Sequence, residues 1–453
     1  MLVRNNIIQL QKMLYYSTNK QSPKVDFREA TINGQAPDKG LYFPEFIPLL
    51  SKQFLAEYKN WSNQEIALEM IKPYVGNSMP LSELKKIVDD TINFDFPLVP
   101  VSDNIFSLEL FHGPTLAFKD VGARFMSRCL GYFVSGMKKQ VTVLVATSGD
   151  TGGAVANGFF NVEGVNVVIL YPSGKVSHTQ ELQLTTNGNN IQALEVNGTF
   201  DDCQKLVKEA FVDRDLSKQL FLTSANSINV ARWLPQQFYY AFALKQWNES
   251  KPPVVAVPSG NFGNICAGLL ASKSGLPIKH FVAACNANDV VPIYLQSGQY
   301  EPKAAVATLS NAMDVGNPSN FIRILEMFQH QFTDLKEMIT SYTITDERTK
   351  EVIKHVYRQH DYLLDPHGAV GYISLKAYLD EHAGDKGIFL GTAHPVKFHD
   401  AIEPLIGKNI PLPKSVEELQ SRKKYSTRIE PKFSELKEIL LGGVVQEAAA
   451  LSD

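Results

Sequence analysis

Short, almost continuously apolar segments recur along the chain and alternate with longer segments of helical periodicity. The apolar runs are Val141–Ala146, Val165–Leu170, Ile191–Val196, Val254–Val257 and His280–Cys285. Strands that are buried on both faces have this pattern. Between them, Asp201–Phe211 has apolar residues at helical spacing with Asp201 as its expected cap, and Ile228–Trp247 predicts a buried aromatic helix. The alternation predicts βαβ units and a parallel sheet, although a closed eight-stranded barrel would show the same alternation.

Both ends of the chain differ from this alternating region. Residues 13–95 are punctuated by prolines and contain two amphipathic segments, Asn63–Tyr74 and Leu81–Ile92, which predict a smaller, mainly helical domain. The chain after about residue 405 is charged and interrupted by prolines, which is typical of surface packing or a tail. We therefore expect an N-terminal domain at 13–95, a two-lobed core at 96–404 with its smaller lobe roughly at 110–225, and a C-terminal segment at 405–453.

The first residues of the chain contain basic but no acidic side chains, and Asp26 is the first acidic residue. An organellar transit peptide is also basic, but this stretch is poor in arginine and serine. We interpret residues 1–12 as an extension or a misassigned start, with Met13 as the initiator.

Length and composition narrow the class of protein. A chain of 453 residues exceeds the size of a single core, which favours two or three domains. The net charge of −3 gives no support for a dedicated nucleic-acid or membrane-surface binder, and no apolar run is long enough to span a bilayer. The four cysteines lack the spacing of a zinc site or a disulfide scaffold, and paired histidines five positions apart do not fit a helical metal motif. We expect a cytoplasmic enzyme without a metal.

Two glycine-rich turns, at residues 145–153 and 257–264, each follow a buried strand and precede a helix. Both turns present backbone N–H groups at a helix N-terminus, where an anion is favoured. Neither turn is a P-loop or a dinucleotide fingerprint, and each could also be a purely structural turn. Two such turns in one chain indicate two anions, or one ligand with two acidic ends.

A lysine in an apolar stretch is the third chemical element of the sequence. Lys119 follows Ala117 and Phe118 within the segment Glu109–Asp120. Burial would lower its pKa and make its neutral amine a nucleophile for a Schiff base, whereas an exposed Lys119 would simply pair with Asp120. A Schiff-base lysine combined with two anion-binding turns is what a pyridoxal phosphate enzyme requires.

Six segments of the chain then carry a specific resemblance. They are LELFHGPTLAFKD, ATSGDTGG, NSINVAR, VPSGNFGN, LDPHGAVG and GTAHPVKF. In order and spacing they resemble the threonine synthases, which belong to the tryptophan-synthase-β-like family of pyridoxal phosphate enzymes. The resemblance covers about residues 13–400. It implies the α/β architecture called fold type II, with two open, mostly parallel twisted sheets flanked by helices, and a smaller helical N-terminal domain.

The resemblance also assigns roles by position. It implies that Lys119 binds the cofactor covalently, that Thr392 faces the pyridine nitrogen, and that Asp150 lies beside the phenolic oxygen. Many relatives in the wider family carry asparagine at the position of Asp150, so its role and protonation stay open. The loop implied to hold the cofactor phosphate consists of Gly260, Asn261, Phe262, Gly263 and Asn264. The residues implied to hold the substrate carboxylate are Ser148, Gly149, Thr151 and Gly152, and our candidates for the substrate phosphate are Arg232 and Lys175.

The activity implied is that of a carbon–oxygen lyase acting on phosphates. It converts O-phospho-L-homoserine and water into L-threonine and phosphate, the last step of threonine biosynthesis. Two alternatives remain at this point: a related phospho-lyase that gives 2-oxobutanoate, and a non-catalytic phosphometabolite-binding protein of the same fold. We expect a small-molecule substrate, no nucleic-acid or membrane partner, and a monomer or homodimer.

Overall fold

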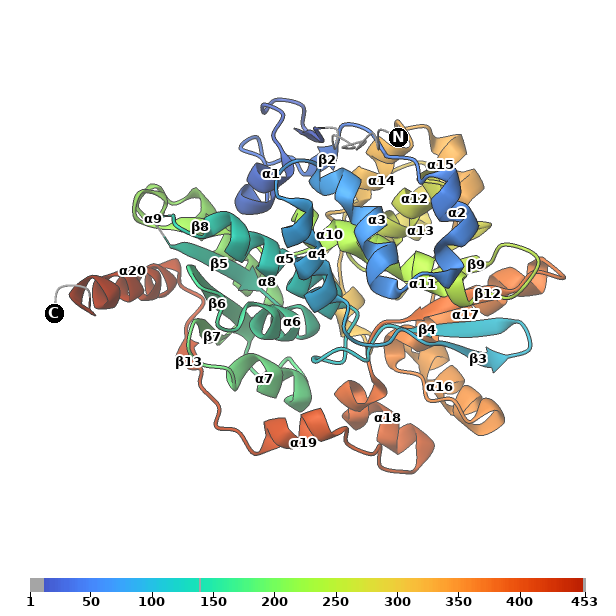
Figure 1. The fold of residues 1–453 in the computed structure, drawn as a ribbon. Coiled ribbons are helices and arrows are strands. Elements are labelled where there is room, and N and C mark those ends of the chain that lie inside the picture. The colour runs from blue at the N-terminus through green and yellow to red at the C-terminus, as the bar shows by residue number, and fades with distance from the viewer. Residues whose placement is uncertain (1–11, 138–139, 451–453) are drawn as a thin grey trace, which may run out of the picture.

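Two β-sheets lie side by side in the computed structural model, and helices cover their faces (Figure 1). The structure describes residues 12–137 and 140–450. The interpretation of residues 1–12 as an extension therefore concerns positions that, apart from residue 12, lie outside the described residues.

The larger sheet has the strand order β11-β10-β9-β12-β4-β3. Neighbouring strands are parallel except β3, which runs antiparallel to β4 at one edge. The strands are β3 (Leu98–Ser102), β4 (Ile105–Glu109), β9 (Val254–Pro258), β10 (His280–Cys285), β11 (Ile339–Thr343) and β12 (Gly387–Gly391). Strands β9, β10 and β12 are buried along their whole length, as expected for the centre of a sheet covered on both faces.

The smaller sheet has the strand order β13-β7-β6-β5-β8, and all its neighbouring strands are parallel. Its strands are β5 (Val141–Ala146), β6 (Val165–Pro172), β7 (Ile191–Val196), β8 (Phe221–Thr223) and β13 (Thr427–Ile429). The edge strand β13 comes from the C-terminal segment, which thereby becomes part of this sheet. The prediction of two open, mostly parallel sheets is confirmed.

Two helices differ from their predictions for local reasons. Helix α8 (Phe200–Val212) is capped by the Thr199 side chain, which accepts a hydrogen bond from the Asp202 N–H, and not by Asp201. The single helix predicted at Ile228–Trp247 is divided into α10 (Val230–Trp233), a 3₁₀ turn η2 (Leu234–Gln237) and α11 (Phe238–Gln246). Pro235 lies in the first turn of η2, where its missing N–H interrupts the α-helical hydrogen bonds.

The remaining helices cover the sheets and form the N-terminal region. That region contains α1 (Phe27–Asn33), α2 (Lys52–Glu57), η1 (Tyr58–Asn60), α3 (Asn63–Val75), α4 (Leu81–Thr91) and a small antiparallel pair, β1 (Tyr15–Ser17) and β2 (Tyr42–Pro44). The smaller sheet is flanked by α5 (Lys119–Val134), α6 (Asp150–Phe159), α7 (His178–Thr185) and α9 (Arg214–Gln219), together with α8. The larger sheet is associated with α12 (Gly263–Lys273), α13 (Val290–Ser297), η3 (Asn311–Met313), α14 (Phe321–Met327), α15 (Phe332–Met338), α16 (Asp346–His360) and α17 (Pro366–Glu381). The chain ends with η4 (Pro395–Phe398), α18 (His399–Ile406), α19 (Lys414–Gln420) and α20 (Phe433–Ala450).

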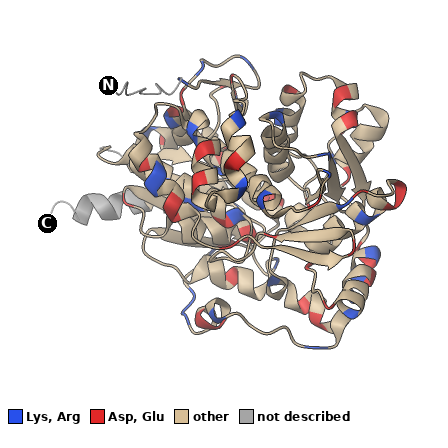
Figure 2. Ribbon diagram, turned by 45° about the vertical axis from the view of Figure 1, so that its right-hand side comes forward, with Lys and Arg blue, Asp and Glu red and all other residues tan. Residues whose placement is uncertain are grey.

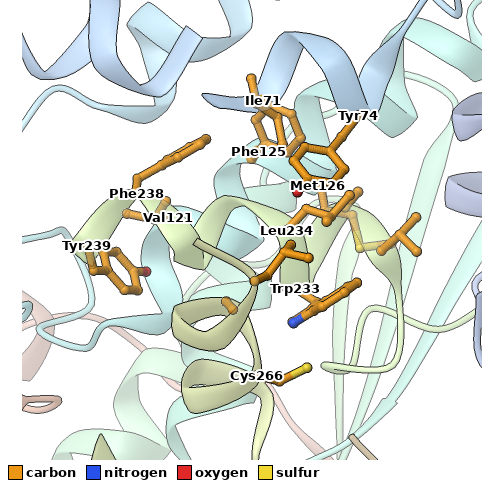
Figure 3. Packing of buried hydrophobic residues seen from close by; sticks show 14 of the residues in the cluster. Ile71, Tyr74, Val121, Phe125, Met126, Trp233, Leu234, Phe238, Tyr239 and Cys266 are labelled. Carbon is orange, nitrogen blue, oxygen red and sulfur yellow. The ribbon is translucent and has the colours of Figure 1, made fainter. Parts of the chain in front are cut away.

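One hydrophobic cluster joins the N-terminal region to the core (Figure 3). Ile71 and Tyr74 of α3 lie in this cluster with Phe125 of α5 and Trp233 of α10, all of them at most 1% exposed. Burial of side chains of this size stabilises the fold by about 1.5–3 kcal/mol each, so the N-terminal helices are firmly attached to the core.

A buried arginine strengthens the same junction. Arg323 of α14 donates hydrogen bonds to the carbonyl oxygens of Tyr42 (3.0 and 3.1 Å) and Ser227 (3.2 Å). It also donates to the Ile228 carbonyl oxygen (2.5 Å), and its guanidinium lies 4.5 Å from the ring centroid of Trp233. Burial lowers the pKa of Arg323 to about 10, so the group keeps its charge at neutral pH. One side chain therefore connects β2 with segments of the core.

Residues of both charge signs are spread along the ribbon. In the view of Figure 2, basic and acidic residues are interspersed along the outer helices and do not gather by sign. In the described part of the chain, no helix combines the length and the apolar character needed to cross a membrane.

Candidate active site

The strand order places three chemically important segments side by side. β12 lies between β9 and β4, and all three strands are parallel. The segments that follow them therefore meet at the carboxyl edge of the larger sheet, which is where open α/β sheets bind ligands. Lys119 follows β4, the Gly260–Asn264 loop follows β9, and Thr392 follows β12.

Lys119 is the first residue of α5 and is anchored through its neighbour. The Phe118 N–H donates to the Thr392 carbonyl oxygen (2.9 Å), and the Tyr239 hydroxyl donates to the Phe118 carbonyl oxygen. A β-bridge between Ala117 and Ala393 adds to this link. The backbone beside Lys119 is thus held by the segment after β12 and by α11.

The environment of Lys119 favours a neutral amine. Burial lowers the pKa of Lys119 to about 8; nearby Lys397 and Arg232 lower it as well, and the carboxylate of Asp150 acts in the opposite direction. The amine is therefore largely neutral above pH 8 and mostly protonated below it. A lysine in this state can act as a nucleophile towards a carbonyl group and as a base.

Asp150 begins α6 in the smaller lobe and is buried. Its Oδ1 accepts hydrogen bonds from Gln180 Nε2 (2.9 Å) and lies 2.7 Å from Lys397 Nζ. Burial alone would raise the pKa of Asp150, but the charges of Lys397 and then Lys119 lower it below its ordinary value. These neighbours favour the ionised form of the Asp150 carboxylate.

The glycine-rich loop after β9 fits the phosphate of a cofactor. It leads into α12, whose first N–H groups are free of intrahelical partners by helix geometry. Asn264 is buried, and its Nδ2 has no hydrogen-bond partner within the described residues, so it can donate to a ligand. Phe262 has a left-handed backbone (φ 58°), which is costly for a bulky residue and marks a loop held by its surroundings.

The Asn261 side chain fixes this loop through two hydrogen bonds. Its Nδ2 donates to Ser227 Oγ (2.6 Å), while its Oδ1 accepts from the Ser319 N–H (2.6 Å). Asn261 thus ties the loop to the segments before α10 and before α14. The Asn261 side chain already has these partners, so it positions the loop more than it offers a free donor.

At Gly260, the same loop has no room for a side chain. A Cβ added at Gly260 would lie 2.5 Å from Met313 Cα, a backbone atom, so the loop would have to move. We expect Gly260→Ala to weaken cofactor binding by at least about tenfold, a loss of about 1.4 kcal/mol. The measurement is a titration of the apoprotein with pyridoxal phosphate, followed by absorbance.

The control for this variant is Gly442→Ala on α20, where an added Cβ meets nothing within 4 Å. It should bind the cofactor like the unmodified chain. Equal affinity of Gly260→Ala and the control would show that the loop does not hold the cofactor phosphate.

The Ser148–Gly152 loop follows β5 and includes the first three residues of α6, and two glycines shape it. Gly149 has a φ of 136°, and a Cβ there would lie 2.4–2.5 Å from the Gln180 amide. Thr147 Oγ1 accepts hydrogen bonds from the N–H groups of Gly149 (3.0 Å) and Gly152 (2.9 Å). These two N–H groups are engaged within the loop, whereas Ser148 and Thr151 remain partly exposed.

The two residues suggested for the substrate phosphate lie in different environments. Arg232 is buried, donates to the Ala225 carbonyl oxygen, and has an Nε without a partner in the described part of the chain. Burial lowers its pKa to about 10. Lys175 lies in the exposed turn after β6. The structure thus brings Arg232, Asp150 and Lys119 together and leaves Lys175 at the surface.

Sequence reasoning missed the residues that support Asp150 and Lys119. Lys397 is fully buried and also donates to the Thr115 carbonyl oxygen (2.9 Å). Thr115 in turn donates its N–H to Asp120 Oδ2 (2.9 Å). The signal for Lys397 was present, because it lies between Val396 and Phe398 shortly after a buried strand.

The fold and this site define a class of enzyme, and a family model agrees. The model described as "Pyridoxal-phosphate dependent enzyme" matches residues 99–390. Two further models, "Threonine synthase N terminus" and "Threonine synthase, C-terminal", match residues 14–92 and 368–440. The chain belongs to the threonine synthase family of pyridoxal-phosphate-dependent enzymes.

Similar proteins cover nearly the whole chain. A threonine synthase of Haemophilus influenzae is 44% identical over 431 residues, which are 95% of this chain and 100% of that protein. The crystal structure of threonine synthase from Escherichia coli has a TM-score of 0.89 at 40% identity, covering 95% of this chain and 100% of that one. A structure described as pyridoxal-phosphate-bound threonine synthase from Brucella melitensis has a TM-score of 0.87 at 34% identity, covering 94% and 98%. These matches confirm the predicted family, fold type and cofactor.

Proposed function

We propose that this chain converts O-phospho-L-homoserine and water into L-threonine and phosphate. The observation that carries the proposal is the set of charges at the carboxyl edge of the sheets. There, the Lys119 amine, with a pKa of about 8, lies near Asp150, whose pKa is lowered. The open helix terminus after β9 belongs to the same sheet edge, where only β12 separates β9 from β4. A lysine that can change its protonation near neutral pH suits repeated proton transfer.

Each part of the site has a proposed task. When bound, pyridoxal phosphate supplies an electron sink for negative charge that develops on substrate carbon atoms. The Gly260–Asn264 loop binds the cofactor phosphate, Lys119 binds the cofactor covalently, and Thr392 faces the pyridine nitrogen. The Ser148–Gly152 loop binds the substrate carboxylate. Arg232 and Lys175 are proposed for the substrate phosphate, and a guanidinium suits that group because it can donate two parallel hydrogen bonds.

Lys119 performs the proton transfers of the proposed reaction. With the cofactor bound, the free Lys119 amine would take the proton from Cα of the substrate, release it, and then take a proton from Cβ. Phosphate would leave from Cγ with the bonding electron pair, protons would return to Cγ and Cα, and water would add its oxygen at Cβ, so that one water is consumed for each phosphate released. The burial of Asp150 and Lys397 around the amine excludes bulk water from this side.

The decisive experiment is product identification. The protein, supplied with pyridoxal phosphate and O-phospho-L-homoserine, is expected to release L-threonine and phosphate in equal amounts, as measured by chromatography and a phosphate assay. A Lys119→Ala variant is the control for non-enzymatic conversion. Formation of 2-oxobutanoate and ammonia would instead show a phospho-lyase, and absence of turnover with the cofactor bound would show a binding protein. Either result would contradict the proposal.

We also propose the domain limits 13–95, 96–404 and 405–453. The family models for the N-terminus and for the pyridoxal phosphate region, which end and begin at residues 92 and 99, support the first boundary. We further propose a cytoplasmic location and a monomer or homodimer. The four free and buried cysteines are consistent with a reducing compartment.

A further inference from the structure

Lys397 is a buried cation to which the proposed reaction gives no chemical step. It belongs to the 3₁₀ turn η4, directly after the segment that contains Thr392, and no part of its side chain is exposed. Lysine is almost never fully buried unless it is paired. We propose that Lys397 is a positioning residue for Lys119: it holds the Asp150 carboxylate in place and balances its charge when the Lys119 amine is neutral.

The contacts of Lys397 join the two lobes. Its Nζ lies 2.7 Å from Asp150 Oδ1 and donates to the Thr115 carbonyl oxygen at 2.9 Å. Asp150 begins α6 of the smaller lobe, whereas Lys397 follows β12 of the larger lobe. Gln180 Nε2 donates to the same Oδ1 of Asp150 at 2.9 Å. The carboxylate is therefore held from both lobes and cannot turn freely.

The order of charges explains how this arrangement serves Lys119. A cation, an anion and a cation follow one another as Lys119, Asp150 and Lys397. When Lys119 loses its proton, the Asp150–Lys397 pair remains balanced. Without Lys397, the same step would leave one uncompensated buried anion, which is costly. Lys397 therefore makes the neutral form of Lys119 accessible at a lower pH, in line with its lowering effect on the pKa of Lys119.

Other charged and titratable groups near Lys119 act from other elements. Arg232 of α10 lowers the pKa of Lys119 and forms no ion pair with Asp150 among the described residues. Asp120, the next residue on α5, is buried with a raised pKa and is hydrogen-bonded to Thr115. Tyr239 of α11 stays neutral because burial raises its pKa. Asp150 is the anion that opposes deprotonation of Lys119, and Lys397 is its direct partner.

The test uses the pH dependence of cofactor capture by the apoprotein. Covalent capture of pyridoxal phosphate requires the neutral Lys119 amine, so its rate should rise with pH around a midpoint near 8. In Lys397→Met we expect this midpoint to rise by about one pH unit, which slows capture about tenfold below the midpoint. The rate is followed by absorbance in a stopped-flow instrument.

An ion pair between a partly exposed lysine and a buried aspartate, away from the site, provides the control. Lys279 pairs with Asp385, and both residues precede strands at the opposite, amino edge of the larger sheet. Lys279→Met should therefore leave the midpoint unchanged. Lys397→Arg, which keeps the charge, should hold the midpoint near that of the unmodified protein. A folded Lys397→Met protein with an unchanged midpoint, or a Lys397→Arg midpoint as high as that of Lys397→Met, would overturn the proposal.

If circular dichroism shows that Lys397→Met does not fold, Asp150→Asn provides the same test from the other side. Loss of the anion leaves Lys119 facing Lys397 alone, so the midpoint should fall below that of the unmodified protein. An unchanged or higher midpoint would refute the arrangement. This inference concerns the same site and rests on the proposed function. The test, however, measures only the capture of the cofactor, for which O-phospho-L-homoserine is not needed. A failure of this test is therefore distinguishable from failure to form threonine.

Discussion

Replacing Lys119 by alanine is expected to abolish turnover while the protein stays folded. The variant lacks both the amine that binds the cofactor covalently and the base that moves the substrate protons. Loss of proton transfer by one positioned group already lowers rates by about 10²–10⁴-fold, and the covalent role adds to this. The measurement combines threonine formation from O-phospho-L-homoserine with the absorbance of the covalently bound cofactor, which should also be missing.

Lys376→Ala is the matched control for this prediction. Lys376 is an exposed lysine on α17 that pairs with Asp380 on the same helix (2.9 Å). Such surface pairs contribute at most about 1 kcal/mol, so activity and absorbance should stay unchanged. A Lys119→Ala protein that turns over substrate at a rate comparable with this control would show that another residue is the nucleophile.

Among the substitutions proposed in this protein, Arg323→Met is expected to cause the largest loss in the free energy of unfolding. The substitution keeps much of the side-chain volume but removes the donors to the carbonyl oxygens of Tyr42, Ser227 and Ile228. Each buried acceptor left without a partner costs about 1–3 kcal/mol, so the free energy of unfolding should fall by about 3 kcal/mol or more. The cation–π contact with Trp233 is lost as well.

Chemical denaturation followed by fluorescence and circular dichroism measures this loss. Arg348→Met serves as the control, because Arg348 is an exposed residue of α16 paired with Glu351. Its removal should change the free energy of unfolding by less than about 1 kcal/mol. If Arg323→Met were as stable as this control, the arginine would not be what fastens β2 to the core.

The parts of the fold that the sequence predicted well are those decided by local patterns. Val141–Ala146 and His280–Cys285 are continuous apolar runs, and both are buried central strands. Lys119 could be found because burial of a lysine among apolar residues calls for a chemical reason. The helices Asn63–Val75 and Leu81–Thr91 follow their amphipathic pattern closely.

The parts that the sequence did not predict depend on contacts between distant segments. β13 is only three residues long and is stabilised as a strand by β7, more than 200 residues away along the chain. The ionised state of Asp150 depends on Lys397, which comes from the other lobe. The pattern of apolar and polar residues also could not show that Arg232 is buried and donates a hydrogen bond to the Ala225 carbonyl oxygen. A single arginine in a helix is usually exposed.

The position of β12 in the larger sheet has a consequence for how the protein is made. β4 ends at Glu109 and must pair with β12, which begins only at Gly387, whereas β5 to β8 of the smaller sheet lie between residues 141 and 223. During synthesis β5 to β8 can pair from neighbouring segments, whereas β4 has only β3 beside it until β12 has been made. Lys119 and Asp150 are thus translated long before Thr392 and Lys397. Assembly of the cofactor site is therefore one of the last events in folding, so an incomplete nascent chain does not present a finished site to the cofactor.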